Sequence, residues 1–273
     1  MIQKFIAGAL AIVGSLANAR RVLLGSPSKR LLTTNNAKIV KGQKEGYFTA
    51  LLHLAPHTLS GHNVCKWSTP GCRAACLNFA GQGGIGTKTD GMGNIIKGNN
   101  CQQARIKRTH ALYDNPSWFI ALLILEIDAH VRKCKRIGMK PAVRLNGTSD
   151  IDWAFRSLNE TGEVIFNMFP DVSFYDYTKD PIRCGQAIYP NYHVLFSRSE
   201  TPGSHRMALR HLHAGFDVAV VFEGPLPDTW HGFKVYDGDL DDLRFRSQGG
   251  QVCGLLPKGH LARRDTSGFV VRS

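Results

Sequence analysis

The sequence lacks several patterns that would assign it to a familiar functional class. Its seven cysteines include no C-x2-C pair and no small-domain disulfide pattern, which argues against a zinc ribbon and a disulfide-stapled domain. Residues 81–86 read GQGGIG, but no strand directly precedes them and the lysine of a P-loop is absent. We therefore expect a mobile glycine-rich loop at this point, with cofactor binding as the alternative.

Acidic residues are also scarce. The chain of 273 residues has 21 aspartates and glutamates against 34 lysines and arginines, a net charge of +13. This excess predicts attraction to polyanions, so we expect a nucleotide or nucleic-acid partner, with an anionic membrane surface as the alternative. The hydrophobic share of 43% is ordinary for a folded chain and allows a sizeable core.

The N-terminus has the features of two different kinds of segment. Residues 1–19 combine a charged start, a short apolar centre and a final A-x-A, as in a secretory signal. The apolar run, residues 5–16, is too short to span a bilayer. Two arginines follow at once, and an odd number of cysteines favours a reducing compartment. We expect a cytoplasmic protein with an apolar and basic helical extension and linker over residues 1–30, and a single α/β domain over 31–273. Export is the alternative.

Three of the cysteines fall close together. Cys65, Cys72 and Cys76 follow a buried-strand pattern, and the Pro70-Gly71 pair between them marks a turn. Cys65 is therefore predicted on a loop. If the segment 73–78 is helical, Cys72 and Cys76 lie on one face, one turn apart.

Three thiolates in this arrangement can bind a soft metal ion or an iron–sulfur cluster and leave one coordination position open. We expect Cys65, Cys72 and Cys76 to be metal ligands, and favour a cluster because closed structural zinc needs four ligands. His62 or Cys101 would supply the fourth ligand in a zinc site. Inert buried thiols are the remaining alternative.

Short apolar segments recur along the chain, and most of them end in small and polar residues. We predict strands at 47–54, 142–145, 172–177, 192–196, 218–222, 233–236 and 251–256, and helices at 101–113, 115–138 and 204–214. A spacing of roughly 15–25 residues between strands indicates parallel βα units. The predicted fold class is α/β: a partial or open (β/α) barrel of about six to seven mostly parallel strands, with an N-terminal helical extension.

In such a barrel the chemistry lies at the carboxyl ends of the strands, where the first strand also delivers the cysteines. Glu200, Asp237 and Asp239 are expected at this edge, although capping and turn formation explain such residues equally well. The candidate cofactor-binding residues there are Asn146, Gly147, Thr148, Ser149, Asp150, Tyr177, Lys179, Ser197, Arg198 and Glu223.

Several of these motifs together resemble an uncharacterised phage family, the one named after mycobacteriophage gene product eighty-eight. The motifs are the segment 35–47, LHLAP at 52–56, NVC at 63–65, PGC at 70–72, CLN at 76–78, RLNGTSD at 144–150 and FYDYTK at 174–179. The similarity covers most of residues 31–260 and implies a phage or prophage origin. The expected location is then the cytoplasm of the infected host.

The three cysteines after the first strand also resemble those of radical S-adenosylmethionine enzymes, although C-x6-C-x3-C departs from the usual C-x3-C-x2-C. That resemblance implies a [4Fe–4S] cluster on the three cysteines, with S-adenosylmethionine on the open iron. The segment 146–150 would take the place of the loop that contacts the amino group of the cofactor. A deoxyadenosyl radical would then abstract hydrogen from the substrate.

Three functional hypotheses follow. The first is a phage or prophage protein with an iron–sulfur site, of the radical S-adenosylmethionine type, acting on a nucleotide or nucleic acid. The second is a zinc-stabilised nucleic-acid-binding protein without catalysis. A hydrolase built on Asp150, Glu223 and Asp237 ranks last, because no nucleophile or metal motif accompanies these carboxylates.

Overall fold

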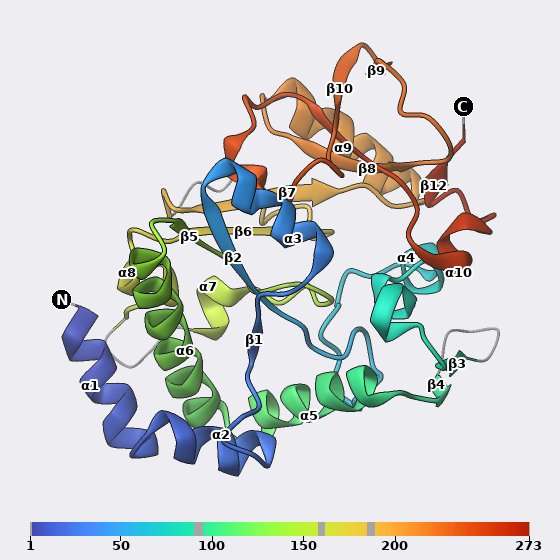
Figure 1. Cartoon of the computed structure of the whole chain (residues 1–273). Helices are drawn as coiled ribbons and strands as arrows, with labels where there is room; N and C mark the ends of the chain where they lie inside the picture. Colours follow the sequence, from blue (N-terminus) through green and yellow to red (C-terminus); the bar gives the residue numbers. More distant parts are fainter. Residues whose placement is uncertain (1, 90–94, 158–161, 185–188, 273) are drawn as a thin grey trace.

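The structure is a computed structural model that describes residues 2–89, 95–157, 162–184 and 189–272. Within these residues one large sheet dominates (Figure 1). Its ten strands are β1 (Leu32–Thr33), β2 (Tyr47–Leu52), β5 (Lys140–Arg144), β6 (Ser173–Thr178), β7 (Tyr192–Ser197), β8 (Val218–Phe222), β9 (Thr229–Trp230), β10 (Phe233–Asp237), β11 (Val252–Leu255) and β12 (Val270–Val271).

The strand order is β1-β2-β5-β6-β7-β8-β11-β10-β9, with β12 paired to β8. Every neighbouring pair from β2 to β10 is parallel, and β1 and β9 pair antiparallel at the two edges. Because β1 and β9 lie at opposite ends of this order, the described sheet is open. The predicted α/β class with a mostly parallel sheet is confirmed.

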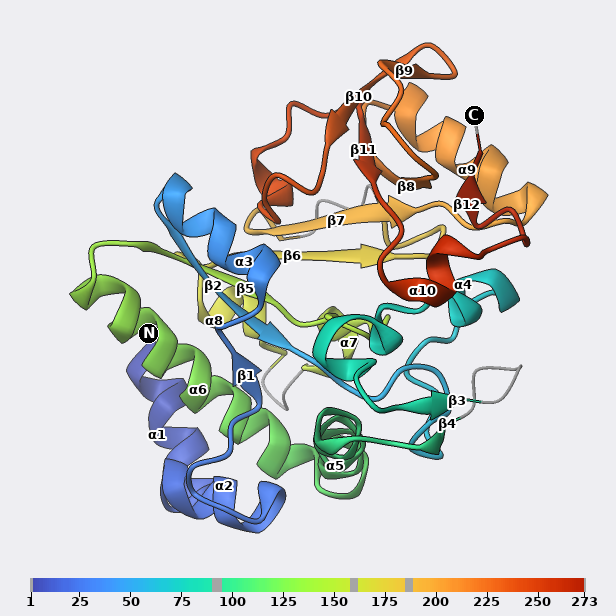
Figure 2. The same cartoon turned by 45° about the vertical axis from the view of Figure 1, so that its right-hand side comes forward.

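Helices pack around this sheet, and two of them form the N-terminus (Figure 2). They are α1 (Ile2–Val13), α2 (Leu16–Leu24), α3 (Ala37–Lys41), α4 (Pro70–Ala74), α5 (Asn100–Asp114), α6 (Pro116–Arg136), α7 (Trp153–Arg156), α8 (Ile165–Met168), α9 (Pro202–His213) and α10 (Gly259–Arg263). A hairpin of β3 (Lys88–Thr89) and β4 (Ile95–Lys97) lies apart from the main sheet.

The longer elements form where the sequence pattern predicts them. β2 is a nearly continuous run of buried residues, as expected for a strand covered on both faces. α6 has proline at its start, an apolar buried face and three basic residues in its last turn, where the helix dipole favours cations. α5 begins at Asn100, one residue before the predicted start, and its N-cap is Asn99, whose side chain accepts a hydrogen bond from Gln102 N.

The two N-terminal helices pack on α6 and share its core. Ala9, Val13 and Leu23 are buried in the same apolar cluster as Phe119 and Leu122 of α6. The chain leaves α2 through a left-handed glycine that caps its carbonyl groups. The predicted N-terminal helices are thus present and packed against α6.

A buried carboxylate ties these helices to the sheet. Glu126 of α6 is only 3% exposed, and its two oxygens accept from Arg20 Nε at 2.8 Å and from Leu32 N at 2.9 Å. Both donors are therefore satisfied by a single group between α2, α6 and β1. Removing that group would leave a buried guanidinium and a buried backbone N–H unpaired.

Within the described part of the chain, no single helix has both the length and the apolar composition to cross a membrane. α1 and α2 meet those criteria only when they are taken together, and the chain bends by 51° between them.

Glu126→Ala is expected to lower the free energy of unfolding by about 3 kcal/mol, because it removes one side of a buried ion pair. Urea denaturation followed by circular dichroism measures the change. Glu45→Ala is the control: its ion pair with Arg246 is exposed, so the loss should stay below about 1 kcal/mol. Equal losses in the two variants would contradict the assigned role of Glu126.

Candidate functional site

The loop that follows β2 carries Cys65 to the carboxyl edge of the sheet. Two contacts join this loop to the turn after β5: Asp150 N donates to Val64 O at 2.8 Å, and the Cys65 thiol lies 3.8 Å from Thr148 O. The neighbouring β2 and β5 are parallel, so both loops leave the sheet on the same side. The Cys65 side chain therefore contacts the backbone of the turn after β5, on the side of the sheet that the parallel topology predicts.

The other two cysteines come from α4 and the residues after it. Cys72 lies inside α4, which ends at Ala74. Cys76 is extended, with φ −62° and ψ 134°, and its sulfur accepts a hydrogen bond from Asn78 N at 3.5 Å. The expectation that Cys72 and Cys76 share one helical face is therefore wrong, because α4 is only five residues long.

Glu200, from the end of β7, fixes the start of α4. Its carboxylate accepts from Thr69 Oγ1 at 2.7 Å and from Gly71 N at 2.8 Å. Gly71 leaves no room for a side chain, since a Cβ there would lie 2.2 Å from Ser267 Oγ. α4, which carries Cys72, is thus held at the carboxyl end of β7, close to α10 (Figures 1 and 2).

The three thiols lie close enough to influence one another electrostatically. Burial raises the pKa of Cys76 to about 12, and repulsion from Cys72 adds to the effect. Burial also raises the pKa of Cys65 well above its usual value, and both other thiols contribute. Arg105 and Lys179 act in the opposite direction on Cys76. Without a bound cation, all these effects together keep the thiols of Cys65 and Cys76 protonated.

In the described residues, the three sulfur atoms are farther apart than the ligands of one bound zinc ion would be. Thiolates bound at about 2.3 Å to one tetrahedral Zn²⁺ lie roughly 3.8 Å apart. Among the described residues, Cys65, Cys72 and Cys76 do not form a set with all ligand atoms within 4.8 Å of one another. Neither His62 nor Cys101 completes such a set with them. An iron–sulfur cluster tolerates wider spacing, because each thiolate binds a different iron.

The turn after β5 is held rigid by the side chain of Asn146. Its Oδ1 accepts from Ser149 Oγ, Ile151 N and Trp153 Nε1, at 2.8 to 3.2 Å. Its Nδ2 and its backbone N both donate to the buried carboxylate of Asp176. Asn146 was predicted to bind a cofactor, and the structure shows its side chain fully engaged within the protein.

The remaining residues of the turn are engaged in a similar way. Thr148 Oγ1 donates to Leu54 O at 2.6 Å. Gly147 packs so closely that a Cβ would lie 2.7 Å from Leu52 O. The turn therefore supports Cys65, and the side chains of Asn146 and Thr148 form hydrogen bonds within the protein.

Asp150 joins the ends of β5 and β6. Its carboxylate accepts from Thr178 Oγ1 at 2.8 Å, Lys179 N at 2.9 Å and Arg183 Nη1 at 2.7 Å. The ammonium group of Lys179 in turn donates to Ser197 Oγ at 2.9 Å. Asp150, Lys179 and Ser197 thus form one hydrogen-bonded chain across three neighbouring strand ends, and their predicted role in cofactor binding stays a prediction.

Other predicted residues make contacts of a different kind. The Tyr177 hydroxyl accepts from Arg244 Nε at 2.6 Å on the opposite face of β6 from Asp176. Arg198 Nη1 donates to Gly268 O at 2.6 Å. Glu223 forms an exposed ion pair with Arg272 at 2.9 Å.

The two aspartates expected at the end of β10 accept hydrogen bonds from nearby groups of the protein. Asp237 Oδ1 accepts from Asp239 N at 2.7 Å. Asp239 Oδ2 accepts from Lys258 Nζ at 2.7 Å and from Leu256 N at 3.0 Å. These contacts fix the β10 and β11 ends, so they explain both residues structurally.

In the glycine-rich segment 81–86, which lies directly after the cysteines, Gly83 and Gly84 are closely packed, while the residues at both ends are exposed. Gly83 O accepts from Gln102 Nε2 at 2.7 Å, and the same nitrogen donates to Asn78 O at 2.8 Å. A Cβ at Gly83 would lie 2.4 Å from Asn78 O. Gly83 thus packs against the segment after Cys76, and the mobility of this glycine-rich loop stays a prediction.

Nothing in the sequence indicated that two further residues, Arg105 and His53, belong to the site. Arg105 of α5 donates to Asn78 Oδ1 at 2.5 Å and lowers the pKa of Cys76. His53 follows β2, and burial, with help from Arg105 and Arg144, lowers its pKa to about 3. The His53 imidazole is therefore neutral. Arg105 lies in the predicted helix 101–113, and no motif there linked it to the thiols.

A buried ionic network around Asp242 packs against β5 and β6. Asp242 accepts from Arg144 Nη1 at 3.1 Å and from the Tyr175 hydroxyl at 2.9 Å, and Lys38 Nζ lies 3.2 Å away. Burial opposes ionisation, but Lys38, Arg144 and Arg244 together hold the pKa of Asp242 well below its usual range. This network links α3 to β5, β6 and the segment after β10.

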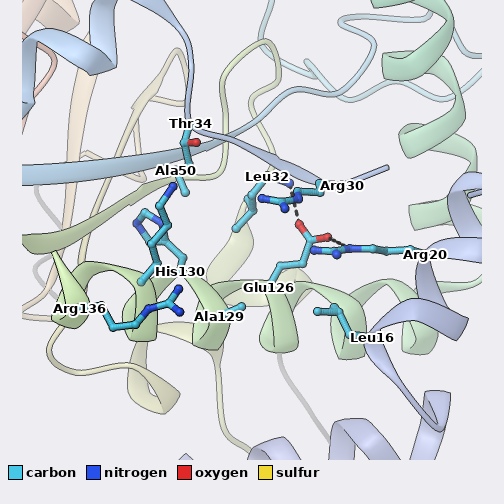
Figure 3. Close-up of a pocket in the computed structure, with 11 residues that line it drawn as sticks. Leu16, Arg20, Arg30, Leu32, Thr34, Ala50, Glu126, Ala129, His130 and Arg136 are labelled. Atoms are coloured by element: carbon cyan, nitrogen blue, oxygen red, sulfur yellow. Dashed lines mark hydrogen bonds and ion pairs between the residues drawn. The ribbon is translucent and has the colours of Figure 1, made fainter. Parts of the chain in front are cut away.

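The clearest hollows in the surface lie along the C-terminal half of α6. One, of about 710 Å³, is lined by Ala129, Arg132, Lys135 and Arg136. The other, of about 300 Å³, lies between α2, α6, β1 and β2, and Figure 3 shows Arg20, Arg30 and Arg136 around it. Because α6 runs toward the amino end of β5, these basic hollows lie at the opposite edge of the sheet from the cysteines.

The fold and the site together define an α/β protein with three thiols at the carboxyl edge of an open, mostly parallel sheet. The chain belongs to the phage family Gene product 88, whose family model matches residues 30–273. The predicted family is confirmed, and α1 and α2 precede the matched region. No curated protein and no solved structure matches the chain.

Gly71→Ala is expected to destabilise the protein by about 1–2 kcal/mol, because the new methyl group displaces Ser267 and Glu200. Gly203→Ala is a matched control. It lies in the second Thr-Pro-Gly helix start of the chain, at α9, where a Cβ meets nothing within 4 Å. Chemical denaturation compares the two, and equal stability would contradict the close packing of α4.

The pH dependence of stability is expected to change in Asp176→Asn. Burial raises the pKa of Asp176 to about 7 from the ordinary value of 3.8, so the folded state binds a proton that the unfolded state has released. The free energy of unfolding therefore falls as the pH rises from about 4 to about 7, by up to about 1.4 kcal/mol per pH unit, and levels off above about pH 7. Asp176→Asn should lack this decline.

Urea denaturation from about pH 5 to about pH 8 measures the two slopes. The exposed Asp171→Asn is the control and should keep the wild-type slope. A wild-type protein whose slope matches that of Asp176→Asn would disprove the assignment.

Proposed function

We propose that this protein holds an iron–sulfur cluster on Cys65, Cys72 and Cys76 and acts as a radical-type phage enzyme on a nucleotide or nucleic acid. The observation that carries the proposal is the gathering of three thiols at the carboxyl edge of a parallel sheet. In this proposal the open sheet is a partial (β/α) barrel, and its strand ends surround the cluster.

Cys65 and Cys72 lie on two segments that are held by the ends of different strands. Thr148, in the turn after β5, contacts Cys65, and Glu200, after β7, fixes the start of α4. The ligands therefore depend on two separate strand ends, which gives a preorganised site. A cluster needs only these three thiolates, whereas closed structural zinc needs a fourth ligand.

The charges around the thiols suit a negatively charged centre. Arg105 and Lys179 lower the pKa of Cys76, against the effects of burial and of Cys72. Lys179 is held in place by Ser197, and Arg105 by Asn78. These two fixed cations can offset the charge of three thiolates once their protons are lost.

S-adenosylmethionine is the proposed second cofactor. When bound, the cluster and this cofactor supply the single-electron chemistry that starts radical reactions. The side chains of Asn146, Thr148 and Asp150 are engaged internally, so recognition of an amino group at this turn falls to the backbone. Thr148 O, which now lies 3.8 Å from the Cys65 thiol, is released as an acceptor when that thiol loses its proton.

The charge of the chain supports the proposed substrate class. A net charge of +13 attracts polyanions such as nucleotides and nucleic acids. An odd number of cysteines without a small-domain disulfide pattern supports a reducing compartment such as the cytoplasm of the infected host.

Anaerobic purification and reconstitution with iron and sulfide should yield a brown protein with about four irons per chain. Replacing Cys65, Cys72 and Cys76 together with alanine should abolish the colour and the bound iron. Cys101→Ala is the control, because it removes an equally accessible thiol from outside the three and should leave the iron content unchanged.

Adding S-adenosylmethionine and a strong reductant to the reconstituted protein should produce 5′-deoxyadenosine, which chromatography detects. A colourless protein with one zinc per chain would overturn the iron–sulfur proposal and support a zinc-stabilised nucleic-acid-binding protein. Bound iron without cofactor cleavage would retain the cluster and exclude the radical reaction.

A further inference from the structure

We propose that His62, His110 and Asp114 bind a divalent transition-metal ion, for which Zn²⁺ is the best match, at a site separate from the three thiols. One ligand atom from each of these residues lies within 4.8 Å of the other two. In the described part of the chain, this is the one group of three potential ligands that comes so close together.

Two of the ligands come from a single face of α5. His110 and Asp114 are four residues apart, and His110 Nδ1 lies 3.8 Å from Asp114 Oδ2. Residues at this spacing project side by side from a helix, and each ligand atom can reach the same ion. α5 therefore provides a regular, rigid base for the site.

The third ligand is oriented by an aromatic stack. The His62 ring lies parallel to that of Tyr113, with centroids 4.1 Å apart and 7° between the planes. The guanidinium of Arg156 lies 4.7 Å from the same tyrosine ring, which adds to its fixation. The His62 ring meets that of His110 edge-on, at 5.6 Å between centroids. His62 is thus directed to α5. In the zinc alternative it was one of two candidates for a fourth ligand beside the cysteines.

The donor set matches zinc chemistry. Imidazole nitrogen and carboxylate oxygen bind Zn²⁺ at about 2.0–2.2 Å, so the three atoms must move slightly closer together. His110 and Asp114 can make this adjustment, since their side chains are 47% and 57% exposed. Three protein ligands also leave one position for water, which is the pattern of an open zinc site.

A bound ion would connect two parts of the thiol site. His62 lies on the loop that carries Cys65, and α5 carries Arg105, which influences Cys76. The ion would therefore cross-link the Cys65 loop to the helix beside Cys76. This inference concerns a second metal and does not depend on the identity of the first.

Calorimetric titration of the full chain with Zn²⁺ tests the proposal. Compared with wild type, His110→Ala should lose one binding step, while every step due to the thiols stays the same. Asp114→Asn should weaken that step by about tenfold or more, since even outer-shell partners of metal ligands are worth about 10-fold to 100-fold in affinity. His213→Ala, which removes an exposed histidine from the last turn of α9, should match wild type.

Titration with Co²⁺ identifies the ligands of the lost step. A site of two histidines and one carboxylate adds weak visible bands without sulfur-to-cobalt charge transfer, and His110→Ala should remove those bands alone. Wild-type stoichiometry and affinity in both α5 variants would overturn the proposal. Loss of a sulfur-to-cobalt band in His110→Ala would also overturn it, because the ion would then be bound by the cysteines.

Discussion

The arrangement of the carboxyl edge depends on the hydrogen bonds of one buried amide, Asn146. Its side chain binds the donors of its own turn and the carboxylate of Asp176 on the neighbouring strand. An amide with both ends satisfied in a buried place can adopt few other geometries. The turn is therefore fixed relative to β6, and Thr148 is held where the Cys65 thiol reaches it.

From this fixed turn the site extends along neighbouring strand ends. Asp150 joins the end of β5 to Lys179 after β6, and Lys179 contacts Ser197 at the end of β7. Glu200 then secures the helix that carries Cys72. Parallel strands bring these groups to one edge although they are far apart in the sequence. The thiols are thus supported by a chain of hydrogen bonds across three strands.

Much of this could be predicted from the sequence. The strands β2, β5, β6, β7, β8, β10 and β11 were found because each is a short apolar run at regular spacing, and α6 because proline and a basic last turn mark its ends. The two-residue strands β1, β9 and β12 escaped, since so short a segment has no period to recognise. At the site, the position of Cys76 was wrong, because α4 ends after five residues in favour of contacts with Asn78.

The sequence by itself determined the order of the strands along the chain, the positive charge and the clustering of three cysteines behind the first long strand. These are local or additive properties, so composition and periodicity reveal them. Only the tertiary structure decided which polar residues face a ligand and which serve the fold. Asn146 and Asp150 are engaged internally, and His62 lies beside His110, because their partners come from distant parts of the chain. Long-range hydrogen bonds leave no periodic trace in the sequence.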